Sequence, residues 1–328
     1  MSNKKIEEGL EHIKVAEKCL KTSLLKWRPD YDEAADEYNK AATCFRNAKS
    51  FEQCKDCLMK AADCQKQNGN NFHAAKSLDQ AILVSKDMND FRSIAQLAER
   101  AAHLFQVSGN AESAAASLDK AAKILEAQNP SQALKLFQQA AQIAIIQDSA
   151  RQAAEYMSKV ARIHVKLQEY DLAADAIRRE MGLHQQSEAY QSMGRLAVGL
   201  VLVQLARGDV VAAEKAFKEW GNCCEAPEVG TLESLLAAFD EEDPEAARVA
   251  LNNPFIKHMD VEYAILARDM PLPQGMTQPM VKSGGVRENA AASYVSPNSH
   301  TTATIEDGGD QPPAVATDED DLEEGGLC

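Results

Sequence analysis

Small and larger apolar residues recur along the chain in a pattern that repeats about every 20 residues. Each copy has a small pair, a larger apolar residue and a second small pair, as in Ala34-Ala35, Tyr38 and Ala41-Ala42. These offsets place all members on one face of an α-helix. The copies begin at positions 34, 54, 74, 94, 114, 133, 153 and 173, a step of 20 residues and once 19. The pattern predicts a row of helices of about 15 residues with short turns between them.

Polar groups mark the ends of these predicted helices. They are Gly-Asn at 69–70 and 109–110, Asn-Asp at 89–90, Asn-Pro-Ser at 129–131 and Asp-Ser at 148–149. Glycine and asparagine end helices readily, and Pro130 suits the first turn of the next helix. A helix with one apolar stripe must bury that stripe against its neighbours. We therefore expect an all-α, tetratricopeptide-like α-α superhelix, a twisted sheet of antiparallel helices, over residues 1–190.

The regular pattern fades after about residue 180, and a C-terminal helical bundle is predicted over 191–270. The apolar run at 196–206 is too short to span a bilayer and indicates a buried helix. Asp243 before Pro244 forms a typical start of a helix. The bundle helices are predicted at 208–220, 231–243, 244–253 and 254–270.

The last segment, 271–328, differs in composition from the rest of the chain. It holds six of the eleven prolines, seven of the sixteen glycines, ten acidic residues and two basic ones. This composition predicts a disordered tail with an acidic end. The net charge of −15 for the whole chain argues against nucleic acid as a partner. Eight cysteines without an apolar leader segment at the start favour free thiols in a reducing, cytoplasmic compartment.

No catalytic motif is recognisable, so neither an enzyme nor a cofactor is predicted. The sequence has no phosphate-binding loop, no zinc-protease motif and no nucleophile elbow. Cys54, Cys57 and Cys64 have the most metal-like spacing, but a structural zinc site needs four ligands. Cys54 also stands where other copies carry a small residue, which favours packed thiols. A metal-dependent hydrolase built on these cysteines remains the alternative.

The segment 22–30 follows the first predicted helix and carries unusually large apolar residues for a turn. Leu24, Leu25 and Trp27 stand beside the basic residues Lys26 and Arg28. One interpretation folds the apolar side chains back onto the first two helices, and periodicity alone favours it. The other places them in a membrane interface, where tryptophan and basic side chains suit the head-group region.

Several of these features together resemble the soluble NSF attachment proteins, the SNAP family, with its gamma branch as the nearest pattern. The features are the 20-residue helical step, the apolar loop, the terminal bundle and the acidic end with a leucine. The residues that carry the resemblance are EGLEHIKVAEKCLKTSLLKWRPDYDEAADEYNKAA at 8–42, NNPFIKHMDVEYAILA at 252–267 and GGLC at 325–328.

The resemblance implies a non-enzymatic adaptor that binds the SNARE four-helix bundle, of the syntaxin type, left after membrane fusion. The adaptor recruits the hexameric ATPase NSF, which disassembles the bundle with ATP in vesicle fusion and intracellular transport. It also implies a cytoplasmic protein that binds membranes peripherally, through contacts of Leu24, Leu25, Lys26, Trp27 and Arg28. A generic tetratricopeptide-like scaffold without ATPase recruitment is the alternative.

Partner-binding residues follow from the expected charges of the partners. An acidic SNARE bundle needs basic side chains, and the candidates are Arg92, Arg100, Lys120, Lys123, Lys135, Lys159, Arg162 and Lys166. By resemblance, carboxylates of the bundle and the tail face a basic surface of NSF, although the charge run at 240–245 by itself indicates only a solvated surface. The tail candidates are Asp318, Glu319, Asp320, Asp321, Glu323, Glu324 and Leu327.

Overall fold

The computed structural model describes residues 2–22 and 27–273. All of the described residues belong to one compact unit. The predicted tail lies outside the described residues from position 274 on. The predicted boundary at 190 stays a prediction, although it coincides with a short 3-10 helix, η1 (Tyr190–Ser192).

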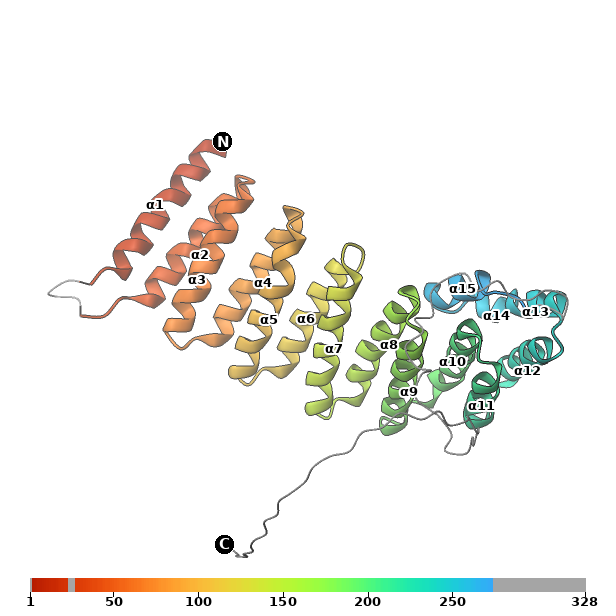
Figure 1. Ribbon diagram of the computed structural model, residues 1–328. Helices are drawn as coiled ribbons and strands as arrows, with labels where there is room; N and C mark the ends of the chain where they lie inside the picture. Colours follow the sequence, from red (N-terminus) through yellow and green to blue (C-terminus); the bar gives the residue numbers. More distant parts are fainter. Residues whose placement is uncertain (1, 23–26, 274–328) are drawn as a thin grey trace, which may run out of the picture. The chain divides into compact units, whose positions relative to one another are not determined.

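The described residues form helices and no strands, as the pattern predicted (Figure 1). The helices of the repeating region are α1 (Ser2–Leu20), α2 (Tyr31–Asn47), α3 (Phe51–Gln67), α4 (Asn71–Asp87), α5 (Phe91–Val107), α6 (Ala111–Leu125), α7 (Pro130–Ile146), α8 (Ala150–Lys166) and α9 (Tyr170–Gln186). After η1 follow α10 (Met193–Arg207), α11 (Val210–Trp220), η2 (Gly221–Cys223), α12 (Ala226–Asp240), α13 (Pro244–Leu251), α14 (Pro254–Lys257) and α15 (Val261–Arg268).

Helices α1 to α9 stand in a row in which each helix packs against the next one (Figure 1). Short turns reverse the chain, so consecutive helices are antiparallel. Helices two apart also touch, since α4 contacts α6 and α5 contacts α7. The odd-numbered helices therefore form one layer of the row and the even-numbered helices form the other.

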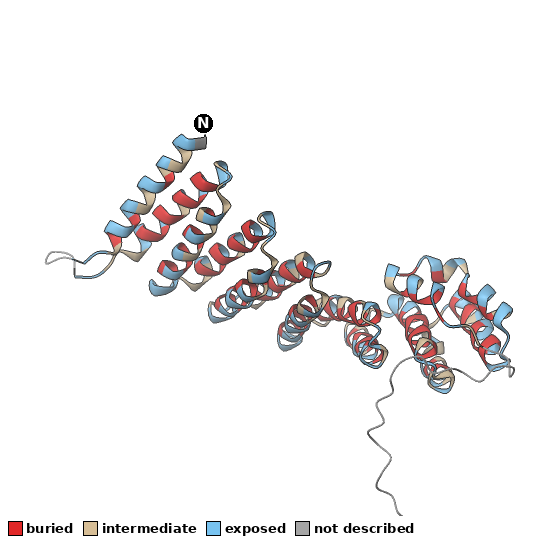
Figure 2. Cartoon of the chain, turned by 45° about the horizontal axis from the view of Figure 1, so that its top comes forward, coloured by how far each residue is buried: buried red, intermediate tan, exposed pale blue. Residues whose placement is uncertain are grey.

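The repeated apolar positions are the buried positions of these helices (Figure 2). In α2, the small pair Ala34-Ala35, Tyr38 and the second pair Ala41-Ala42 are all buried, and the equivalent residues of α4 and α6 are buried too. Alanine pairs allow close approach of neighbouring helices, and the larger residue between the pairs fills the remaining space. The prediction of the fold class from this pattern is confirmed.

The turns share one geometry, and they lie where the polar residues of the sequence predicted the helix ends. After α2, the Ser50 N–H donates to the Phe45 carbonyl at 2.9 Å and the Lys49 N–H to the Arg46 carbonyl at 3.0 Å. This is a Schellman ending, which needs one residue in the left-handed conformation. The residues with positive φ in the equivalent turns are Lys49, Gly69, Asn89, Gly109, Asp148, Gln168 and Glu188.

The connection between α6 and α7 has four residues, 126–129, instead of three, and α6 is two residues shorter than its neighbours, which together give the 19-residue step. This connection has no left-handed residue among those described. Instead, the Asn129 side chain accepts a hydrogen bond from the Gln132 N–H at 3.1 Å, and Pro130 occupies the first turn of α7 as predicted. The step was thus read correctly from the sequence, including its one exception.

In the C-terminal bundle, α10 is the buried apolar helix expected at 196–206, and it contacts α9, α11, α12 and α15. Asp243 caps α13 through the Glu245 N–H at 2.9 Å and the Ala246 N–H at 3.0 Å, as predicted. Several predicted helix boundaries differ by two or three residues from the observed ones, and two differences are larger. Helix α12 begins before 231, because the Glu228 side chain accepts from the Glu225 N–H and starts the helix there.

The helix predicted at 254–270 is divided into α14 and α15. Asp260 lies between them with the extended backbone angles φ −56° and ψ 147°, which no helix contains. The preceding His258 carbonyl accepts a hydrogen bond from the Arg195 guanidinium of α10 at 2.8 Å. A long-range contact of this kind leaves no signal in the local sequence pattern.

Candidate interaction surfaces

The segment that joins α1 to α2 presents Trp27 to solvent. The Trp27 residue is 88% exposed, and Arg28 beside it is exposed too. The base of the segment is closed by a hydrogen bond from the Asp30 N–H to the Cys19 carbonyl at 3.0 Å. Asp30 also caps α2 through the Glu33 N–H. Trp27 therefore does not fold back onto the first two helices, and the other contact residues Leu24, Leu25 and Lys26 lie outside the described residues.

The eight basic candidates for SNARE binding divide between the two layers of the row. Arg92, Arg100 and Lys135 belong to α5 and α7, in the odd layer. The even layer holds the other five on α6 and α8, namely Lys120, Lys123, Lys159, Arg162 and Lys166. The eight side chains thus lie in one region of the row, on α5 to α8, but they are divided between its two layers.

Three of the eight candidates take part in contacts between helices two apart. Each of these three is the tenth residue of its helix and reaches a carboxylate on the helix two positions earlier. The pairs are Arg100 with Asp63 at 3.2 Å, Lys120 with Asp79 at 3.4 Å and Lys159 with Asp119 at 2.5 Å. The tenth residue of α7 is a glutamine, and the Gln139 amide likewise donates to Glu99 at 3.3 Å. We call these contacts the lateral ladder.

The lateral ladder was not predicted from the sequence, although the sequence contains a signal for it. Counted from the helix starts, the tenth residue is basic in six of the eight helices α2 to α9, namely Lys40, Lys60, Arg100, Lys120, Lys159 and Arg179. A basic residue at a fixed position of a repeat indicates a role within the repeat itself. Several of the candidate side chains therefore stabilise the row and are only partly available to a partner.

The remaining candidates differ in their availability. Arg92, Lys135 and Lys166 are exposed, and their side chains form no ion pair within the described part of the chain. Lys123 pairs with Asp119 on its own helix at 2.6 Å. Arg162 is half-buried, and its Nε atom lies buried without a hydrogen-bond partner among the described residues.

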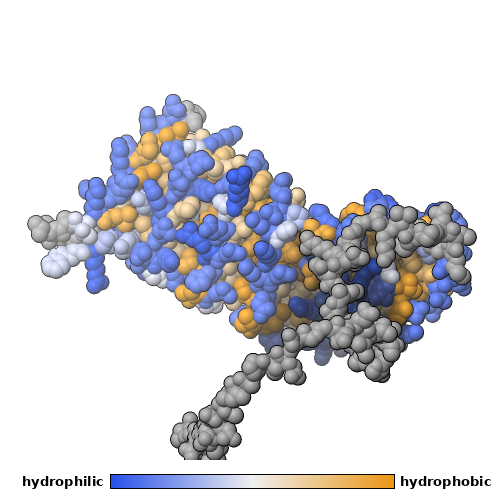
Figure 3. Space-filling view, viewed as in Figure 1, coloured by the Kyte–Doolittle hydropathy of each residue, from blue (hydrophilic) through white to orange (hydrophobic). Residues whose placement is uncertain are grey.

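Two grooves lie between helices of the odd layer. One is lined by residues of α3, α4 and α5, including Arg100 and Lys66, and the other by residues of α7, α8 and α9, including Arg179 and Leu172. In Figure 3, hydrophilic side chains cover most of the visible face of the helical row, with smaller apolar patches between them. The odd layer thus offers hollows with basic residues at their edges.

A buried polar cluster lies where α15 of the bundle packs against α8 of the row. Glu180 of α9 is 4% exposed, and its burial raises the pKa of the carboxyl, while the nearby His184 imidazole, whose Nε2 atom lies 3.8 Å from the carboxylate, opposes that shift. Burial and the nearby Glu180 charge also raise the pKa of the Tyr263 phenol on α15, and Arg162 of α8 lies close to both groups. The cluster joins two parts of the fold and exposes little surface to a partner.

The charge run at 240–245 forms the turn between α12 and α13. Asp240, Glu241, Glu242, Asp243 and Glu245 are all exposed, which agrees with the solvated surface that the run indicated. Glu245 also pairs with Arg248 at 2.9 Å. The tail candidates Asp318, Glu319, Asp320, Asp321, Glu323, Glu324 and Leu327 lie outside the described residues.

The cysteines with metal-like spacing are packing residues. Cys54, Cys57 and Cys64 of α3 are buried, and the described residues do not bring them together with other metal-ligating side chains. Burial raises the pKa of the Cys57 thiol to about 12 and those of Cys54 and Cys64 above their usual range. Thiols that stay protonated are poor nucleophiles.

Of the helices that the structure describes, none combines the length and the apolar character that crossing a bilayer requires.

Three known proteins are similar to this chain in sequence. A gamma-soluble NSF attachment protein of Dictyostelium discoideum is 25% identical over 285 residues, which cover 86% of this chain and 88% of the relative. The gamma protein of Arabidopsis thaliana is 25% identical over 78% of this chain and 89% of its own length. An alpha-soluble NSF attachment protein of Vitis vinifera is 30% identical over 73% of this chain and 84% of its own length.

Solved helical-repeat structures show a weaker likeness. BtubC from P. vanneervenii is 12% identical with a TM-score of 0.36, covering 68% of this chain and 90% of its own. A tetratricopeptide repeat protein from Parabacteroides merdae is 14% identical with a TM-score of 0.27, covering 80% of this chain and 100% of its own. The assignment of the fold therefore rests on the helices of this chain.

The family model described as soluble NSF attachment protein, SNAP, matches residues 7–253, which include nearly all of the helical row and most of the bundle. The resemblance stated from the sequence is thereby confirmed. The chain belongs to the soluble NSF attachment protein family.

Proposed function

We propose that this chain is a non-enzymatic adaptor that binds SNARE four-helix bundles and recruits the NSF ATPase for their ATP-driven disassembly. The observation that carries the proposal is the family match over residues 7–253.

The SNARE bundle is proposed to bind along the odd layer of the row. This layer has two grooves, and its basic residues Arg92 and Lys135 are exposed without an ion pair among the described residues. A further groove, lined mainly by α6 and α8 of the even layer, carries the carboxylates of Glu112, Asp148 and Glu155 and suits an acidic partner less well. Arg100 and Arg179 at the edges of the two odd-layer grooves add positive charge, which Asp63, Glu99 and Asp175 in the same grooves partly offset. Complementary charges of this kind speed encounter with an acidic helical bundle and set its register. Arg100 also belongs to the lateral ladder, so its share in binding is smaller than that of Arg92 and Lys135.

The membrane contact is proposed at the segment 22–30, as a weak and peripheral anchor. The exposure of Trp27 and Arg28 supports it, because an exposed indole beside a guanidinium suits the interface of an anionic membrane. Burial of one large apolar side chain contributes roughly 1.5–3 kcal/mol at most. A single loop therefore holds the protein at a membrane only when several adaptors bind one SNARE bundle together. This location is cytoplasmic and peripheral.

NSF is proposed to bind the acidic end of the chain. The exposed turn at 240–245 offers carboxylates from a fixed position between α12 and α13. The acidic tail residues from 318 to 324 and Leu327 are proposed to contribute as well. A basic surface on the amino-terminal domain of NSF would complement these carboxylates.

The decisive experiment is reconstituted disassembly. Purified SNARE complex, NSF, ATP and the full-length chain are mixed, and release of single SNARE proteins is followed on gels or by fluorescence. Disassembly that requires this chain supports the proposal. Binding of SNARE complex without recruitment of NSF would instead identify a tetratricopeptide-like scaffold, and binding of neither partner would reject both functions.

A further inference from the structure

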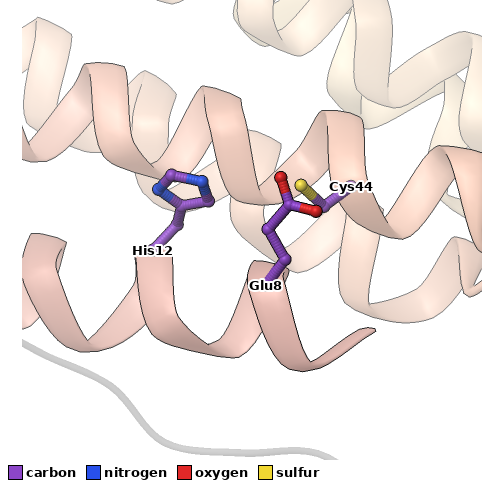
Figure 4. A group of neighbouring side chains, drawn as sticks. All are labelled: Glu8, His12 and Cys44. Carbon is purple, nitrogen blue, oxygen red and sulfur yellow. The ribbon is translucent and has the colours of Figure 1, made fainter. Parts of the chain in front are cut away.

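Helices α1 and α2 bring three different metal-ligating side chains together. Glu8 and His12 stand one turn apart on α1, and Cys44 faces them from α2 (Figure 4). One carboxylate oxygen, one imidazole nitrogen and the sulfur lie within 4.8 Å of one another. Cys44 is buried, whereas Glu8 and His12 are half-exposed, so an ion can reach the group from solvent.

A glycine brings the two helices close enough for this contact. Gly9 follows Glu8 on α1 and lies against the Phe45 ring, which follows Cys44 on α2. A Cβ atom at position 9 would lie 2.9 Å from the Phe45 Cζ atom, closer than side chains tolerate. Since glycine has no Cβ, α1 approaches α2 at this turn and places the Glu8 carboxylate beside the Cys44 sulfur.

The imidazole of His12 is held in the orientation that metal-binding histidines have. Its Nδ1 atom lies 2.7 Å from Oε2 of Glu37, whose other oxygen accepts from the Lys40 ammonium at 2.6 Å. A carboxylate only accepts hydrogen bonds, so the Nδ1 atom carries the proton and the Nε2 lone pair is free. In Figure 4 the nitrogen nearer to Glu8 and Cys44 is the one not bonded to Glu37. A carboxylate behind a ligating imidazole is the usual support at zinc sites.

We propose that Glu8, His12 and Cys44 bind a zinc ion that clamps α1 to α2. One thiolate, one imidazole and one carboxylate match the ligands that zinc takes, whereas magnesium and calcium take oxygen ligands alone. Zinc–ligand bonds of about 2.0–2.3 Å set ligand atoms roughly 3.5 Å apart, so the side chains close by about 1 Å around the ion. With three protein ligands the site is of the open type, in which water takes the fourth position, and not a closed structural site with four protein ligands.

Two groups change their bonds when the ion enters. The Lys5 ammonium lies 2.7 Å from the Glu8 carboxylate, and it moves into solvent when that carboxylate binds zinc. The Cys44 S–H bond breaks, its proton passes to solvent and a sulfur–zinc bond forms, with no change of oxidation state. Since α1 packs chiefly on α2, the ion would fasten this first helix to the rest of the row.

The test is metal titration of the full-length, metal-free chain. Zinc binding is measured by calorimetry, and cobalt binding by the thiolate-to-cobalt absorption that a Cys ligand produces. We expect one equivalent of metal, a cobalt spectrum with that absorption and a higher Tm with zinc. Cys44→Ser and Glu8→Gln should each weaken zinc binding at least tenfold, whereas the matched controls Cys223→Ser and His73→Ala should leave it unchanged.

Each other outcome overturns the proposal. Equal binding by Cys44→Ser and the unaltered chain identifies an adventitious ion only, and so does a cobalt spectrum without thiolate absorption. If zinc binding is lost with Cys44→Ser but kept with Glu8→Gln, the assignment of three ligands is wrong. Cys44 belongs to the core, so melting of each variant without metal is compared first, and Glu8→Gln, which keeps the size of the side chain, decides if Cys44→Ser does not fold.

Discussion

The Lys159 ammonium of α8 lies 2.5 Å from the Asp119 carboxylate of α6, two helices earlier in the chain. The other oxygen of Asp119 pairs with Lys123 at 2.6 Å, so one carboxylate holds two of the basic residues considered for partner binding. Both Asp119 and Lys159 are largely buried. A contact of this kind stabilises the even layer of the row.

Replacement of Asp119 by asparagine should lower the free energy of unfolding by about 1 kcal/mol, because it removes the charge that holds Lys159 and Lys123. Urea unfolding at low and high salt measures this change. The control is Asp36→Asn, since Asp36 is exposed and has no ion pair among the described residues. Equal effects of both substitutions would show that Asp119 does not stabilise the row.

Replacement of Gln168 by glycine should raise the stability by about 1 kcal/mol. Gln168 has φ 59° in the turn after α8, and a side chain is disfavoured in that conformation. The reverse change, Gly109→Ala at φ 78°, should lower the stability by a similar amount. Thermal and urea unfolding of the two variants should therefore shift in opposite directions, and shifts of the same sign would contradict the explanation.

Replacement of Glu180 by glutamine should change how stability depends on pH. Burial raises the folded-state pKa of Glu180 above its ordinary value of 4.5, so the folded chain retains this proton while the unfolded chain has lost it. Stability therefore falls as pH rises from about 4.5 through the folded pKa. Arg162, His184 and Tyr263 surround the carboxyl and set where that fall ends.

In the Glu180→Gln variant this fall should be absent, so its stability relative to the unaltered chain should increase with pH. Unfolding by urea between pH 4.5 and 8 measures the difference. The exposed Glu155 supplies the control Glu155→Gln, which should keep the slope of the unaltered chain. Parallel curves for the chain and the Glu180 variant would show that the carboxyl does not titrate abnormally.

Reversal of charge at Arg92 and Lys135 together should weaken binding of SNARE complex roughly tenfold at low salt, mainly through slower association. Association kinetics on immobilised SNARE complex measure this. Lys215→Glu in α11 is an exposed control away from the row. A larger effect from Lys166→Glu than from the Arg92 and Lys135 pair would place the binding face on the even layer instead.

Replacement of Leu24, Leu25 and Trp27 by serine should lower the fraction of protein that floats with anionic liposomes, because the apolar side chains no longer enter the interface. Disassembly of SNARE complex in detergent should stay unchanged, since no membrane is present. Unchanged lipid-dependent activity of this variant would refute the membrane contact.

The repeating part of the fold could be predicted because its signal is local. Alanine pairs at fixed offsets give the buried face, and residues such as Gly69 and Asn89 mark the turns within a few positions of the helices they end. The start of α12 at Ala226 and the break at Asp260 were missed. The first depends on a capping contact of Glu228, and the second accompanies a bond from Arg195 that is far away in the sequence.

The zinc ligands could not be found from spacing. Cys44 lies 32 residues after His12 and on another helix. The three side chains meet where Gly9 allows α1 to approach Phe45, a contact between helices that the spacing of ligands along the sequence does not show. By contrast, Cys54, Cys57 and Cys64 have metal-like spacing, but on α3 they are used in packing.

Because most turns of the row have the same geometry, a hairpin could be removed from the row without changing the turns that remain. Gly69-Asn70 and Gly109-Asn110 end α3 and α5 with the same two residues, forty positions apart. Joining Asn70 directly to Ala111 would remove one hairpin and still leave a Gly-Asn turn before the next helix. Such a shortened protein would bring α1 one hairpin nearer along the row to the acidic turn at 240–245, and its activity would show what length of row the adaptor needs.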